Sequence, residues 1–124
     1  MAISKLPEGF SHADVADVDL SAKLHYFAKA TATGIDLAGD GATVLGTIIE
    51  AAALAKPVTV QFGGIGKVVA AETIAANARI ASDTNGKAVN AAVGDFEVGT
   101  ALPGASTAAG ELCSFVFAPG RRHA

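Results

Sequence analysis

The chain has 124 residues, 51% of them hydrophobic but only 6% aromatic, and a formal net charge of −3. This length suits one domain with a core of small side chains, and the single cysteine, Cys113, excludes an internal disulfide. Scattered basic residues, short apolar runs and a first segment unlike a secretion signal lead us to expect a protein made in the cytoplasm with no nucleic-acid or membrane partner.

The first 19 residues differ from the rest of the chain. They contain Pro7, Gly9 and three spaced aspartates, and no apolar period is sustained. We interpret residues 1–19 as an extended N-terminal arm, which could reach on the order of 60 Å when fully stretched. The arm offers Ile3, Leu6 and Phe10 to a neighbouring surface, and these are our candidate contact residues.

Residues 20–118 show the alternation and turn signals of a mainly β domain, a small β-barrel or sandwich. A helical turn is expected at residues 50–56, because a helix of that length ending at Pro57 is marginal. Asn85-Gly86 predicts a two-residue hairpin turn with positive φ at both positions. Residues 119–124 form a polar tail. Strands are expected at residues 24–29, 35–37, 44–49, 58–62, 67–70, 78–82, 87–89, 96–102 and 112–117.

The sequence also repeats itself. Gly46 in one predicted strand is matched by Gly99 53 residues later, and each is followed by a small-residue turn and a further strand. Turn and strand signals before these glycines match in the same order at nearly the same offset. This pattern predicts two similar β units, at about residues 25–64 and 78–118.

Motifs that would carry chemistry are incomplete. The run Gly63-Gly64-Ile65-Gly66-Lys67 lacks the hydroxyl residue of a phosphate-binding loop and the third glycine of a dinucleotide fingerprint. His12, His25 and His123 have no ligand spacing, and Asp14, Asp17 and Asp19 lack the pattern of a calcium loop. Cys113 lies in an apolar strand, where we expect it to be inert packing. We therefore expect no catalytic, cofactor-binding or metal-binding residue, and no enzyme activity.

The chain contains six short segments in a set order: Asp19-Leu20-Ser21-Ala22-Lys23, Val44-Leu45-Gly46, Pro57-Val58-Thr59-Val60, Gly66-Lys67-Val68-Val69, Ile80 through Val89, and Val98-Gly99-Thr100-Ala101-Leu102. Taken in this order, they resemble the tailed-phage capsid decoration proteins, also called head cement proteins. The resemblance covers roughly residues 19–117. Ala71 and Asn77 stand where the family usually has glycine, and neither the segment before Asp19 nor the Arg121-Arg122-His123 tail matches.

The resemblance implies a small β protein that binds the outer surface of an icosahedral head and stabilises it against internal DNA pressure. Its expected partners are the major capsid protein and two further copies of itself in a trimer, and its expected location is the virion. Two alternatives stay open on the sequence. One is a small-ligand-binding or enzymatic β-barrel with its mouth near residues 63–67, and the other is a low-copy tail or baseplate interaction module.

Overall fold

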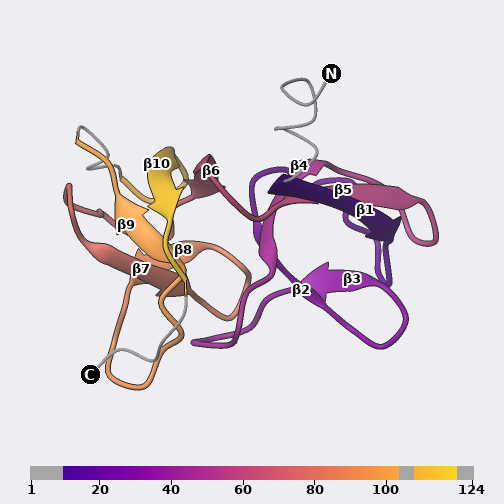
Figure 1. Cartoon of the computed structure of the whole chain (residues 1–124), viewed down its shortest axis with the longest axis horizontal. Coiled ribbons are helices and arrows are strands. Elements are labelled where there is room, and N and C mark those ends of the chain that lie inside the picture. The colour runs from indigo at the N-terminus through magenta and orange to yellow at the C-terminus, as the bar shows by residue number, and fades with distance from the viewer. Residues whose placement is uncertain (1–9, 104–107, 120–124) are drawn as a thin grey trace.

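The computed structural model describes residues 10–103 and 108–119, which form ten strands arranged as two five-stranded antiparallel sheets (Figure 1). The first sheet lies on one side of the molecule and the second on the other, so each half of the chain builds its own sheet. The strands are β1 (Ser11–Val15), β2 (Phe27–Ala30), β3 (Ile35–Leu37), β4 (Gly46–Glu50), β5 (Pro57–Gln61), β6 (Ile65–Val69), β7 (Arg79–Ser82), β8 (Ala88–Asn90), β9 (Gly99–Ala101) and β10 (Leu112–Phe117).

Both sheets follow the same path. The first sheet has the strand order β1-β5-β4-β2-β3 and the second has the order β6-β10-β9-β7-β8. Adding five to each strand number of the first sheet gives the order of the second. Each sheet also has an isolated parallel bridge near its two edges, Ala16 with Ile35 and Ala70 with Ala88. The predicted duplication and the sandwich-like class are thus confirmed, and the sheets do not close into barrels.

The boundaries of the repeat differ from the prediction. The first unit spans residues 11–61 and the second spans residues 65–117, so each unit begins one strand earlier than expected. These opening strands, β1 and β6, lie at sheet edges and pair on one side only, with β5 and β10 respectively. In β1 no residue is buried, so the alternation that reveals a strand in the sequence is missing there. The strand β6 alternates and was expected at residues 67–70, but it was placed outside the second unit.

The predicted arm is wrong where the structure describes it. Ser11–Val15 pairs with Pro57–Gln61, and Ala16 and Leu20 just after it are almost fully buried. The strand was not expected because His12 and Asp14 share a sheet face with the buried Val60 and Val58, and apolar residues are the usual choice on such a face. Both side chains nevertheless stay about half exposed, His12 at 57% and Asp14 at 48%, and polar residues of this kind are one way in which edge strands avoid pairing with other molecules. Residues 1–9 lie outside the described residues.

The repeated glycines Gly46 and Gly99 have one structural reason. A Cβ at Gly46 would overlap the carbonyl oxygen of Gln61 on β5, and a Cβ at Gly99 would overlap that of Val116 on β10. Each glycine therefore lets the fourth strand of its unit approach the fifth strand closely. The close approach of backbones that a glycine within a strand suggests is present in both units.

Each unit has a hydrophobic core, and the two cores correspond. The seven buried residues of the first core each have a counterpart at the same place in the second. The second core also takes in Phe27, Ala38 and Val44, which belong to the first unit. The first core consists of Ala16, Leu20, Ala28, Ile35, Ile48, Val58 and Val60. Their counterparts are Ala70, Ile74, Ile80, Ala88, Ala101, Cys113 and Phe115.

Phe27 is the centre of the junction between the units. Its side chain is fully buried and meets the ring of Phe115 edge to face, with ring centroids 5.9 Å apart. The backbone N of Phe27 donates to the carbonyl of Gly86 at 2.7 Å, and the N of Val69 donates to the carbonyl of His25 at 2.8 Å. Backbone hydrogen bonds and a shared core therefore hold the two units together.

The turn at Asn85-Gly86 differs from the predicted two-residue hairpin. Only Gly86 has positive φ, at 79°, and residues 83–87 separate β7 from β8. The carboxylate of Asp83 accepts hydrogen bonds from the backbone N of Asn85 and of Lys87, both at 2.8 Å. This aspartate supports a longer turn in which one left-handed residue is sufficient. The expected helical turn at residues 50–56 is likewise a simple turn, with Ala55 at φ 68°.

Replacing Gly86 by valine should lower the free energy of unfolding by about 1–3 kcal/mol. A β-branched residue is strained at this φ, and its Cβ would lie 2.8 Å from the carbonyl oxygen of Phe27. Chemical unfolding monitored by circular dichroism measures the effect. Gly94→Val is the matched control, since Gly94 also has positive φ, at 89°, but a Cβ there would meet nothing within 4 Å. Equal losses in the two variants would show that the contact with Phe27 adds nothing.

Candidate interaction surfaces

Among the described residues, no group of three or more histidines, cysteines or acidic residues could hold a metal ion. No helix there is long and apolar enough to span a membrane. Asp17 accepts hydrogen bonds from the hydroxyls of Thr31 and Thr33, and Asp19 accepts one from the backbone N of Ser21. Asp17 and Asp19 thus stabilise turns of the backbone. His123 lies outside the described residues.

The glycine-rich run does not form a phosphate loop. Gly64 has φ 75°, and β6 begins at the next residue, so Gly66 and Lys67 are strand residues with alternating side chains. A phosphate loop needs successive backbone N–H groups that converge on one point, and a strand directs them to alternate edges. Only the first two residues of the run, Gly63 and Gly64, belong to the connection between the two units.

Cys113 lies on β10 with its side chain fully buried in the second core. Burial raises the pKa of its thiol, which keeps the thiol protonated and poorly nucleophilic. The prediction that Cys113 packs as a small apolar residue is confirmed.

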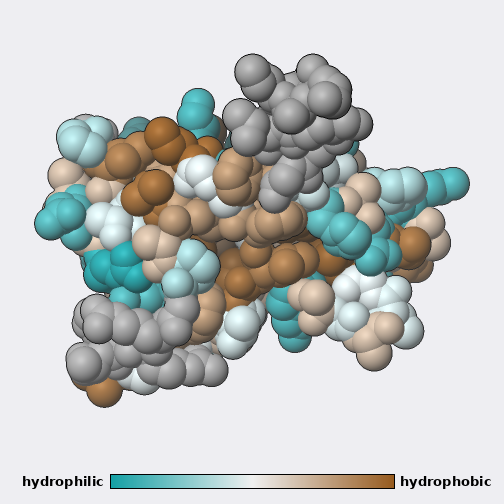
Figure 2. All heavy atoms as spheres, viewed as in Figure 1, coloured by the Kyte–Doolittle hydropathy of each residue, from teal (hydrophilic) through white to brown (hydrophobic). Residues whose placement is uncertain are grey.

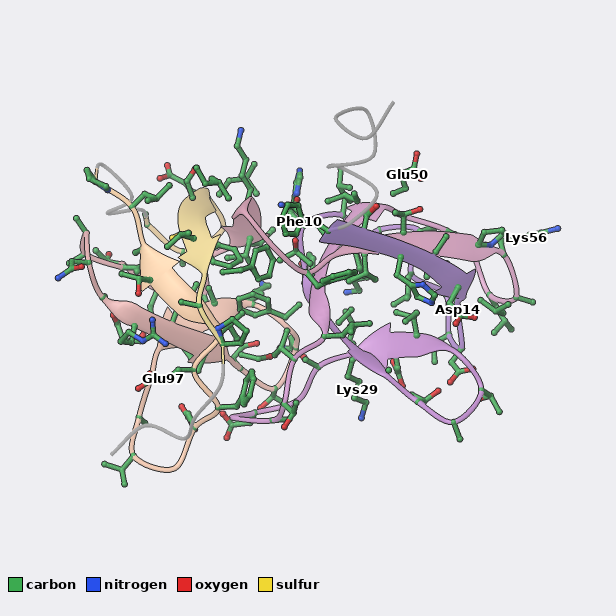
Figure 3. The ribbon with its side chains drawn as sticks, viewed as in Figure 1. Phe10, Asp14, Lys29, Glu50, Lys56 and Glu97 are labelled. Atoms are coloured by element: carbon green, nitrogen blue, oxygen red, sulfur yellow. The ribbon has the colours of Figure 1, made fainter. Side chains whose placement is uncertain are left out.

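Of the three predicted contact residues, Phe10 alone is described, since Ile3 and Leu6 fall within residues 1–9. Its side chain is 44% exposed and covers Gly63 at the boundary between the two halves of the molecule (Figure 3). It forms one wall of a mostly apolar pocket of about 440 Å³, whose other lining residues are Ser11, Ile49, Gln61, Gly63, Gly64 and Ile65. Gln61 already donates to the carbonyls of Gly63 and Ile65, both at 2.8 Å.

His25 lies beside the junction with an unusual backbone. Its φ is 66°, its carbonyl accepts the hydrogen bond from Val69, and its buried Nδ1 meets no hydrogen-bond partner in the described part of the chain. Burial, with a smaller effect from the positive charge of Lys67, lowers the pKa of its imidazole. The folded protein therefore favours neutral His25. Asn77 occupies the same position in the second unit, with φ 68°.

We expect stability to fall as the pH drops below about 6.5, the ordinary pKa of histidine. Because the folded state lowers the pKa of His25, the unfolded state binds more protons in this range, and protonation favours unfolding. His25→Asn tests this, because asparagine tolerates the left-handed backbone and does not titrate. Its unfolding midpoint should depend less on pH between pH 7 and 5 than that of the wild type. An unchanged pH dependence would exclude His25 as its cause.

The two sheets each have an outer row of four cross-strand neighbours, directed away from that sheet's own core. In the first unit the row is Ser11, Gln61, Thr47 and Phe27. In the second unit it is Ile65, Val116, Thr100 and Arg79.

These rows have opposite environments. Thr47 and Phe27 in the first row are fully buried, and Phe27 packs into the second unit's core. In the second row, Ile65 is 65% exposed and Val116 is 37% exposed. The first unit's outer row is thus partly covered by the second unit, whereas no further unit follows in the described chain to cover the second row.

A buried ion pair replaces the apolar contact of the first unit. Arg79 and Glu97 stand at the places that Phe27 and Val44 have in the first unit. The Nε of Arg79 donates to a carboxylate oxygen of Glu97 at 2.8 Å, and Glu97 is only 1% exposed. The other guanidinium nitrogens donate to the hydroxyl of Thr100 and the carbonyl of Ala118. The second unit therefore presents polar groups where the first unit presents an apolar contact.

The outer face of β6 and β10 carries exposed apolar side chains. Leu112 is 43% exposed and shares this face with Ile65 and Val116, and apolar residues gather over these strands in Figure 2. Lys67 and Ser114 lie between them as cross-strand neighbours. We call Ile65, Lys67, Leu112, Val116 and Arg79 the second outer face. Sequence reasoning missed this face, although an alignment of the two repeats with β1 and β6 included would have placed Arg79 at the position of Phe27.

The geometry defines a tandem of two like β units that share a core at their junction. A solved structure with a similar fold is the N base of head fiber gp8.5 in bacteriophage phi29, with a TM-score of 0.70. The match covers 91% of this chain and 98% of that one at 14% sequence identity, and it shows a shared fold. No protein-family model matches the sequence, and no curated protein matches it. The resemblance to decoration proteins stays a prediction.

Proposed function

We propose that this chain is a structural protein of a phage head, bound to the outer surface of the capsid as a decoration protein. The observation that carries the proposal is the fold shared with the head fiber base along nearly the full length of both chains. Apolar side chains on the second outer face, which the fold leaves uncovered, also favour a protein partner. The proposed role needs no catalysis, and we assign the chain none.

In this proposal the partner is the major capsid protein, the location is the virion, and the chain stabilises the shell against internal pressure. The copies associate as trimers on the shell, as the family resemblance implies. Many copies on a closed shell each add a modest contact, so strong single sites are not required.

The proposal is tested by measuring the copy number of the chain in purified virions, relative to the major capsid protein, by mass spectrometry. A decoration protein should be present in high copy number, and heads that lack it should break at a lower temperature. Cryo-electron microscopy of the same particles would show density on the outer surface. A few copies per particle would instead indicate a tail or baseplate module, and absence from virions would overturn the proposal.

The predicted role of the N-terminus is tested on a shorter segment than the sequence suggested. Because Ser11–Val15 is a strand of the first sheet, the deletion must stop at residue 9. Removal of residues 1–9, with Ile3 and Leu6, should leave the unfolding midpoint nearly unchanged and reduce the amount of protein retained on heads. Full retention would show that attachment does not need this segment.

A further inference from the structure

The second outer face corresponds to a surface that the protein already uses for contact between its two units. Its row Ile65, Val116, Thr100 and Arg79 occupies the same sheet positions as the first unit's row. The first row is buried at Thr47 and Phe27, where the second unit packs against it. The duplicated architecture therefore presents one covered and one uncovered version of the same face.

The uncovered version has the composition of an interface. Ile65, Leu112 and Val116 are exposed there, whereas the first unit has Ser11, Pro57 and Gln61 at the same places. The apolar residues are thus particular to the uncovered face and are not required by the fold. Exposed apolar residues gathered on one sheet face indicate a site of protein contact.

The unbalanced charge on this face is positive. Lys67 is exposed among the apolar side chains, whereas the guanidinium of Arg79 at the far end of the row is balanced by the carboxylate of Glu97, 2.8 Å away. Neither β6 nor β10 contains an acidic residue. In a protein of net charge −3, a locally positive apolar face selects a partner surface that combines apolar groups with carboxylates.

A second copy of the chain fits this face poorly. The contact between units depends on Phe27 and Val44, which pack into the second core. On the second outer face the same places hold the Arg79–Glu97 ion pair, so another copy cannot repeat the apolar junction. Two copies meeting face to face would also bring Lys67 against its own counterpart, and like charges in an interface oppose association.

We propose that the second outer face is the surface by which this protein docks on the shell protein of the head. The partner supplies an apolar strip that packs on Ile65, Leu112 and Val116, and a carboxylate that meets Lys67. This inference rests on the proposed function, because it names the surface that makes the proposed attachment.

The test uses the full chain and purified heads, from the phage that encodes it, that lack this protein. The double variant Ile65→Ser and Val116→Gln carries the residues that the first unit has at the same positions, so the sheet should tolerate them. Leu54→Ser is the matched control, since Leu54 is an exposed apolar residue, 58% exposed, on a turn of the first unit. Co-sedimentation with heads measures binding, and sedimentation velocity of the free protein measures self-association.

We expect wild type and Leu54→Ser to bind equally, and the double variant to bind at least tenfold more weakly with an unchanged unfolding midpoint. Lys67→Glu should also weaken binding, whereas Lys67→Arg should preserve it. If the wild type binds and the double variant binds equally well, the face is not the docking surface although the proposed function stands. If the wild type itself does not bind heads, the proposed function fails. A double variant that loses only self-association would assign the face to a second copy and overturn the proposal.

Discussion

Replacing Phe27 by alanine should lower the free energy of unfolding by about 3–5 kcal/mol, the largest effect that we expect from a single apolar substitution. Phe27 belongs to the first unit by sequence, but its fully buried ring lies in the second unit's core against Phe115. Its removal would leave a cavity at the junction between two sheets, where the cost includes both lost burial and lost contacts.

Chemical unfolding followed by circular dichroism measures the loss. Phe10→Ala is the control, because the Phe10 side chain is 44% exposed, and we expect a loss below about 1 kcal/mol. The junction also joins the two units, so the transition of Phe27→Ala should become broader if the units begin to unfold separately. A loss equal to that of Phe10→Ala would show that the second core does not depend on the first unit.

The repeat could be predicted from the sequence because both units need the same backbone at the same points. Gly46 and Gly99 each allow a close approach between strands, and this requirement leaves a visible residue in both halves. The strands with inward apolar residues were predicted for the same reason, since alternation of Val58 and Val60 with polar neighbours is a local signal.

The first opening strand, β1, could not be predicted because its signal is not local. His12 and Asp14 occupy core-side positions of β1, and the strand is recognisable only from its pairing with β5. The prediction for the turn at residues 83–87 was wrong in the length of the turn and in the φ of Asn85, because a side-chain contact decides the backbone conformation there. The Asp83 carboxylate holds the backbone, so Asn85 does not need the left-handed conformation that an Asn-Gly pair favours.

The second outer face could not be predicted from the sequence, because it depends on how the two units pack. Ile65, Leu112 and Val116 read as ordinary strand residues, and nothing local distinguishes a covered sheet face from an uncovered one. Burial of Phe27 by the neighbouring unit and exposure of the equivalent row appear only once the two sheets are placed together.

The Arg79–Glu97 pair should show the second large effect. In the single variant Arg79→Phe, the Glu97 carboxylate, 1% exposed, loses its guanidinium partner. Leaving one member of a buried ion pair without the other commonly costs about 3–5 kcal/mol, and we expect a loss of about 3 kcal/mol because the Arg79 side chain is 26% exposed. Urea unfolding of the wild type, of Arg79→Phe and Glu97→Val alone, and of the double variant completes a double-mutant cycle.

Adding Glu97→Val to Arg79→Phe should restore most of that loss, to within about 1 kcal/mol of the wild type, because replacing both members of a buried pair by apolar residues is often neutral. The two residues introduced are those of Phe27 and Val44, which pack together in the second core. The double variant would thus carry the apolar contact surface of the first unit with no further unit in the described chain to cover it, and we expect it to self-associate in sedimentation velocity as its concentration rises. If Arg79→Phe alone is as stable as the wild type, Glu97 does not depend on Arg79. If the double variant is stable and stays monomeric, the ion pair is not what prevents a further unit from stacking there.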